Sequence, residues 1–132
     1  MEPALSAEFG SPLKLSANLG IRIGSPAGTD KEPGAGRGFL LQVQPGLGGV
    51  AFNVGFTPVA LPAWGTQAVG FAAKARVLRT WGSPWSLEPK QTFAGAELDV
   101  AWIVKVSFGV LRRVQAGPGK ATAFTWSIGI GL

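Results

Sequence analysis

The chain has 132 residues, of which 46% are hydrophobic and only 14% are charged, and it carries a net charge of +5 at pH 7. It contains no cysteine and no histidine, which excludes a disulfide framework, a Cys/His zinc site and a Ser-His-Asp triad. The length suits a single domain over residues 1–132, and the low charge argues against a disordered chain.

Membrane-spanning helices are not predicted. Such a helix needs about 20 consecutive apolar residues, whereas the longest clean runs here are short, such as residues 68–73. The N-terminal residues Met1-Glu2-Pro3 lack the basic and apolar regions of a secretory signal. If the protein is exported, we therefore expect its leader to be absent from this form of the sequence.

Apolar residues alternate with small or polar ones along most of the chain. Residues two apart share one face of a β-strand, so this period of two predicts strands. Clusters rich in Gly and Pro separate most of the alternating segments. A hairpin near Ala101-Trp102 is inferred from a change of phase alone. The predicted strands are eight, at residues 5–9, 13–23, 39–44, 50–56, 69–77, 94–100, 102–111 and 124–132.

The two faces of the predicted strands differ strongly in size and polarity. One face carries bulky Phe, Trp, Leu, Ile and Val side chains, and the other carries mostly Gly, Ala, Ser, Asn and Gln. The interior of an eight-stranded barrel is just wide enough for side chains to fill it, so the bulky face would overpack it. A membrane barrel instead turns the apolar face to lipid and the polar face to the lumen. We therefore predict an all-β fold, an eight-stranded antiparallel transmembrane (up-and-down) β-barrel.

The charges within the strands lie on the polar face and are predicted to point into the lumen. A register that pairs Lys105 with Glu97 or Asp99 would join acids and bases there. We interpret this set as an ion-pair network that neutralises buried charge, rather than as acid–base machinery. The predicted lumen residues, with five cations and three acids, are Glu8, Lys14, Arg22, Lys74, Arg76, Glu97, Asp99 and Lys105.

Four tryptophans lie in loops or near strand ends, where the aromatic girdles of membrane barrels lie. They are Trp64, Trp81, Trp85 and Trp102.

The final segment, Phe124-Thr-Trp-Ser-Ile-Gly-Ile-Gly-Leu132, alternates most clearly. With this segment and the pattern of the whole chain, the protein resembles the small eight-stranded bacterial outer-membrane β-barrels. The segment is similar to the C-terminal β-signal of that family, in the residues Phe124, Trp126, Ile128, Ile130 and Leu132. The resemblance implies an outer-membrane location, and it implies the barrel-assembly machinery, the lipid bilayer and lipopolysaccharide as partners.

We predict a structural or adhesive, non-enzymatic membrane protein that is monomeric and has no catalytic residue, metal or cofactor. Nucleic acid is not an expected partner, because the in-strand aromatic residues lie on the face opposite the in-strand Lys and Arg. Three alternatives stay open: a narrow anion-leaning channel, a designed or engineered transmembrane barrel or nanopore, and a soluble lipid-binding barrel with its faces reversed.

Overall fold

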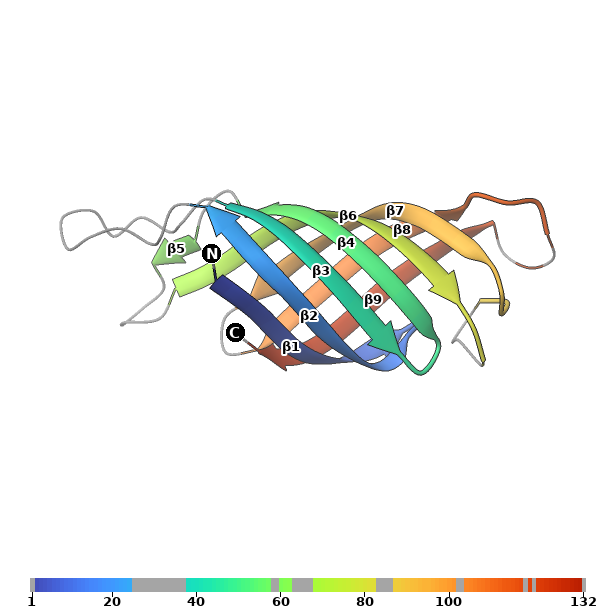
Figure 1. Cartoon of the computed structure of the whole chain (residues 1–132), viewed down its shortest axis with the longest axis horizontal. Helices are drawn as coiled ribbons and strands as arrows, with labels where there is room; N and C mark the ends of the chain where they lie inside the picture. Colours follow the sequence, from blue (N-terminus) through green and yellow to red (C-terminus); the bar gives the residue numbers. More distant parts are fainter. Residues whose placement is uncertain are drawn as a thin grey trace.

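The computed structural model describes residues 2–24, 38–57, 60–62, 68–82, 87–101, 104–117, 119 and 121–131. These residues form strands and no helix (Figure 1). The strands are β1 (Glu2–Ser11), β2 (Lys14–Gly24), β3 (Gly38–Gly46), β4 (Gly49–Thr57), β5 (Ala60–Pro62), β6 (Ala68–Thr80), β7 (Thr92–Ala101), β8 (Lys105–Arg113) and β9 (Thr122–Gly131). A helix long and apolar enough to cross a membrane is not found in the described part of the chain.

Eight of the strands close into an antiparallel barrel. The sheet runs in the order β4-β3-β2-β1-β9-β8-β7-β6, and β6 pairs back with β4. The first and last strands meet along a seam that runs from Ser6 opposite Gly131 to Ser11 opposite Trp126. The predicted all-β, eight-stranded antiparallel barrel is confirmed. Strand β5 is an addition to it: this short strand pairs with β6 within a region that the sequence predicts as a turn.

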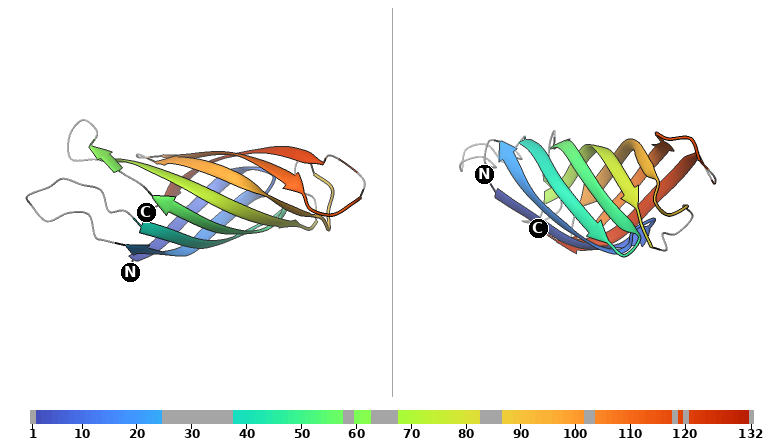
Figure 2. Two further views of the ribbon diagram at one scale, coloured as in Figure 1. Left: turned by 90° about the horizontal axis from the view of Figure 1, so that it is seen from above. Right: turned by 45° about the vertical axis from the view of Figure 1, so that its right-hand side comes forward.

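The two ends of the barrel differ. The chain termini lie at one end, which we call the terminus end, and β2 ends and β3 begins there, where Gly24 lies opposite Gly38 (Figures 1 and 2). The opposite end, which we call the turn end, carries the tight connections at Pro12-Leu13 between β1 and β2 and at Leu47-Gly48 between β3 and β4. Both termini lie at one end because the barrel has an even number of strands.

The hairpin between β7 and β8 corrects the predicted register. Ala101 lies opposite Lys105, and Asp99 lies opposite Ser107, so Lys105 pairs with neither of the acids predicted to face it. Val104, predicted within a strand, lies in a bend before β8 begins. The short connection after Ala101 fixes this register, as turns do in hairpins.

The alternation of the sequence appears directly in the burial of the strand side chains. In β4, for example, Phe52 is 58% exposed and Val54 is 55% exposed, whereas Asn53 between them is 1% exposed. The bulky apolar face therefore points outward and the polar face inward. The large hydrophobic side chains of the barrel wall that are at least 45% exposed are Leu5, Phe9, Leu15, Leu19, Phe39, Phe52, Val54, Val77, Leu98, Phe108, Val110, Phe124, Ile128 and Ile130.

Candidate functional site: the polar interior of the barrel

Glu8 lies at the centre of a hydrogen-bond network inside the barrel. Its carboxylate is buried and accepts hydrogen bonds from Ser127 at 2.8 Å, from Gln44 at 3.1 Å and from Ser6 at 3.0 Å. Asn18 and the ammonium group of Lys105 donate to it as well. These donors come from β1, β2, β3, β8 and β9, so one carboxylate joins both sides of the closing seam.

A second group of buried charges spans β6 and β7. The Nζ atom of Lys74 lies 2.9 Å from Oε1 of Glu97 and 2.8 Å from Oδ2 of Asp99. Arg76 forms an ion pair with the other oxygen of Glu97. Lys74 and Glu97 lie directly opposite each other in the antiparallel register, which places their side chains on the same inner face.

Lys105 connects the two groups, because its Nζ atom contacts Glu8 and also lies 3.2 Å from Oδ2 of Asp99. The connected set contains three cations and three carboxylates, and its formal charge is therefore zero. A buried charge without a partner is costly, so this balance suits a closed interior. The members of this set, which we call the lumen network, are Glu8, Lys74, Arg76, Glu97, Asp99 and Lys105.

Two predicted lumen residues lie outside the lumen network. Lys14 is the first residue of β2 at the turn end, is half-buried and has a left-handed φ of 63°. Arg22 lies at the terminus end, where it lines a pocket of ≈ 110 Å³. The lumen network itself is neutral, and with Arg22 the interior holds four cations and three carboxylates among the described residues.

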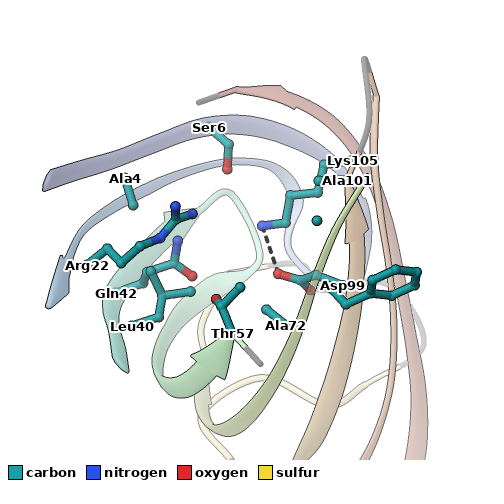
Figure 3. A pocket seen from close by; sticks show the side chains of 12 residues that line it. Ala4, Ser6, Arg22, Leu40, Gln42, Thr57, Ala72, Asp99, Ala101 and Lys105 are labelled. Atoms are coloured by element: carbon teal, nitrogen blue, oxygen red, sulfur yellow. Dashed lines mark ion pairs between the residues drawn. The ribbon is translucent and has the colours of Figure 1, made fainter. Parts of the chain in front are cut away.

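The pocket is the part of the interior that reaches the terminus end. Arg22 and Gln42 enter it from β2 and β3 and face the Lys105–Asp99 ion pair across it (Figure 3). Ser6 and Thr57 add hydroxyl groups to its wall. Asp99 and Lys105 are each held by a partner of opposite charge, so this wall offers paired charges rather than a carboxylate poised for proton transfer.

The turn end of the interior is apolar. Leu78, Phe93 and Leu111 are completely buried there and pack with Ala51 and Leu13, with Leu87 against them. The sequence did not predict this cluster. Leu78 and Phe93 lie just beyond the ends of the predicted strands, whereas β6 continues to Thr80 and β7 begins at Thr92. The interior is thus polar towards the terminus end and closed by apolar side chains at the turn end.

Leu13 corrects a further prediction. The alternation assigns it to the outer face with Leu15, yet it is 3% exposed. Leu13 lies in the turn between β1 and β2, because β1 ends at Ser11 and β2 begins at Lys14. Its side chain packs with the apolar cluster at the turn end of the barrel. The signal available in the sequence was Ser11-Pro12, because proline commonly marks a turn.

Trp81 is 43% exposed and lies just after β6 at the turn end, a strand-end position suited to an interfacial girdle. The other predicted girdle residues, Trp64, Trp85 and Trp102, lie outside the described residues. In the final strand, Phe124, Trp126, Ile128 and Ile130 all point outward, and Leu132 lies outside the described residues.

In the described ranges, histidine, cysteine, aspartate and glutamate residues do not gather into a group able to hold a metal ion. Comparisons of the chain with protein-family models, with curated proteins and with solved structures found no match. The function is therefore argued from the residues and their geometry.

Proposed function

We propose that the protein is an integral membrane β-barrel whose eight long strands cross a lipid bilayer, and that its role is structural or adhesive rather than enzymatic. The observation that carries this proposal is the exposed apolar wall. Residues such as Leu98 and Phe108, each 62% exposed, cover the outside of the barrel, while the charges of the lumen network are inside. Soluble proteins rarely expose a contiguous apolar patch larger than a few hundred Å².

The strand lengths also support a membrane location. The barrel strands contain 9 to 13 residues, and about 9–11 tilted residues cross the hydrocarbon core of a bilayer. A closed barrel satisfies the backbone hydrogen bonds of every strand, which lipid cannot do. Contact with lipid removes the free-energy cost that these apolar side chains would have if they were exposed to water.

A filled interior favours a structural role over the anion-leaning channel. The lumen network occupies the middle of the barrel, and the cluster around Phe93 closes the turn end. We expect the protein to give no resolvable single-channel current in a planar bilayer. Stepwise anion-selective current would favour the channel instead.

The resemblance of the final strand to a β-signal supports a bacterial outer-membrane location and assembly by the barrel-assembly machinery. When the chain is expressed with an export signal in a Gram-negative host, we expect it in the outer-membrane fraction with heat-modifiable gel mobility. Accumulation in the soluble periplasm would contradict this location.

A matched pair of lysine substitutions tests the membrane proposal. Leu98→Lys places a cation on the outer wall within β7, three residues from the nearer end of the strand, and Leu47→Lys places the same cation in the turn between β3 and β4. The two leucines are similarly exposed, at 62% and 66%. A lysine at the bilayer midplane costs about 2–4 kcal/mol, and near the interface about 0–1 kcal/mol.

Reversible urea unfolding in lipid vesicles measures both variants against the parent chain. We expect Leu98→Lys to lower the free energy of unfolding by an amount near the midplane cost of about 2–4 kcal/mol, and Leu47→Lys to change it by about 0–1 kcal/mol. Equal stabilities, or a chain that folds as a monomer in buffer without lipid or detergent, would mean that water rather than lipid covers the wall. The second result would favour the soluble lipid-binding alternative.

A further inference from the structure

Two arginines interrupt the apolar outer wall. Among the strand side chains that the structure describes, Arg79 on β6 and Arg112 on β8 are the charged residues classed as exposed. Both lie near the turn end of their strands. They stand on the two neighbours of β7 and are offset by two residues along it, so about 12 Å separates their backbones at the usual strand spacing and rise per residue. Two extended arginine side chains can close that span.

Small residues separate the two arginines. Thr92 lies opposite Arg79, and Ala94 lies opposite Arg112 on the same outer face of β7. The guanidinium of Arg79 donates a hydrogen bond of 2.9 Å to the hydroxyl of Thr92, which holds it against the wall. The outer surface between the two arginines therefore carries only small side chains and lies between two positive charges.

An apolar groove begins next to Arg112 and continues along β7, β8 and β9 towards the middle of the barrel. Its volume is ≈ 500 Å³. The small side chain of Ala96 leaves it hollow on the outer face, and larger side chains form its sides. The row nearest to Arg112 is Ala96, Val110 and Phe124, and the next row is Leu98, Phe108 and Trp126.

A second groove offers an internal comparison. It lies over β1 and β2, has a volume of ≈ 540 Å³, and is hollow at the opposed alanines Ala7 and Ala17. Next to this groove, towards the turn end, the outward side chains are Phe9 and Leu15. Neither of these residues is an arginine. The two grooves are thus alike in size and polarity, and the groove over β7 and β8 adds the two cations.

We propose that Arg79 and Arg112, together with the groove beside Arg112, form a binding site for one anionic phospholipid. The phosphate accepts hydrogen bonds from the two guanidinium groups, and one acyl chain lies over Ala96. Guanidinium groups bind phosphate oxygens through paired donors, and the acyl chain fills a groove lined by apolar side chains. This site rests on the proposed membrane location, because the groove faces lipid only there.

Tryptophan quenching by brominated lipids tests the site, since Trp126 lines the groove. A chain that keeps Trp126 as its only tryptophan is placed in phosphatidylcholine vesicles, and brominated phosphatidylcholine or brominated phosphatidylglycerol is then titrated in. Each cation near an anionic lipid contributes about 1 kcal/mol, or about fivefold in affinity. We expect phosphatidylglycerol to quench Trp126 with at least a fivefold higher apparent affinity than phosphatidylcholine.

Matched variants locate the effect. Arg79→Gln with Arg112→Gln is expected to bring the two lipids to parity, whereas Lys14→Gln, which removes a cation from the same end beside β1, is expected to keep the preference. Ala96→Leu fills the groove and is expected to abolish the preference, and Ala17→Leu in the comparison groove is expected to leave it.

Three results would overturn the site. The first is equal quenching by both lipids, and the second is an equal loss of preference with Lys14→Gln, which would indicate general surface charge. The third is a dimer that dissociates in Ala96→Leu, which would assign the groove to a second copy of the chain. A chain that fails to insert into phosphatidylcholine vesicles overturns the proposed function and the site together, whereas an inserted chain without a preference overturns the site alone.

Discussion

The lumen network predicts a strong penalty for removing a single buried charge. Lys74 lies within 2.9 Å of two carboxylates and is completely buried. In the Lys74→Met variant, Glu97 keeps Arg76 and Asp99 keeps Lys105, but the network carries one uncompensated negative charge. Breaking a buried ion pair in this way costs about 3–5 kcal/mol.

Removing a second charge of opposite sign is expected to recover part of that loss. Asp99→Asn alone leaves an excess positive charge and is also expected to cost about 3–5 kcal/mol. The double variant Lys74→Met/Asp99→Asn is again neutral, so its cost is expected to be close to that of one single variant. The non-additivity is then about 3 kcal/mol, at the upper end of measured couplings between contacting residues.

Reversible urea unfolding in detergent micelles or vesicles, followed by intrinsic fluorescence, measures this cycle. Lys90→Met serves as the control, because Lys90 is exposed in the β6–β7 connection and its loss is expected to change stability by less than about 0.5 kcal/mol. If the two single effects simply add in the double variant, Lys74 and Asp99 do not interact and the described lumen network is wrong.

Two further predictions concern packing. Phe93→Ala, which opens a cavity in the apolar cluster at the turn end, is expected to cost about 3–5 kcal/mol in the same unfolding assay. Phe124→Ala on the outer wall is expected to cost less because, in the proposed membrane, lipid fills the vacated space, and an equal loss would contradict the assigned faces. Gly95→Ala is expected to reduce the folded fraction on a heat-modifiability gel, because the new Cβ would meet the carbonyl oxygen of Val110 and lie 2.8 Å from Cα of Leu111. Gly70→Ala, whose Cβ would have no neighbour closer than 3.8 Å, is the matched control, and similar yields would mean that β7 and β8 are not paired as described.

The alternation of the sequence was sufficient to predict the number of barrel strands and the composition of the two faces. The outward placement of Phe52 and Val54 and the inward placement of Asn53 follow directly from the period of two. This information is local to each strand, and no long-range contact is needed to read it. The even strand number then brings the termini to the same end.

What lies at each end of the barrel could not be predicted in the same way. Leu78 and Phe93 point inward, although the large apolar side chains of this sequence otherwise mark the outer face. Their size therefore gave the wrong indication of where the strands end. The register at Lys105 depends on the length of a connection that has no glycine or proline to mark it. The partners of Glu8 depend on how β1 meets β9 at the seam, which is a property of barrel closure rather than of any single strand.

Closure also suggests why a barrel with an apolar outer wall keeps six charges inside. A strand that slips by one residue turns its apolar side chains inward and its polar side chains outward, so the polar interior and, in the proposed membrane, the surrounding lipid oppose that error. A slip by two residues keeps every face correct and must be opposed by specific contacts. Glu8 receives donors from four other strands, and Lys74 requires Glu97 directly opposite it. The lumen network therefore distinguishes the observed register from the neighbouring ones that hydrophobicity leaves equivalent, in the way that buried polar groups specify register in other folds.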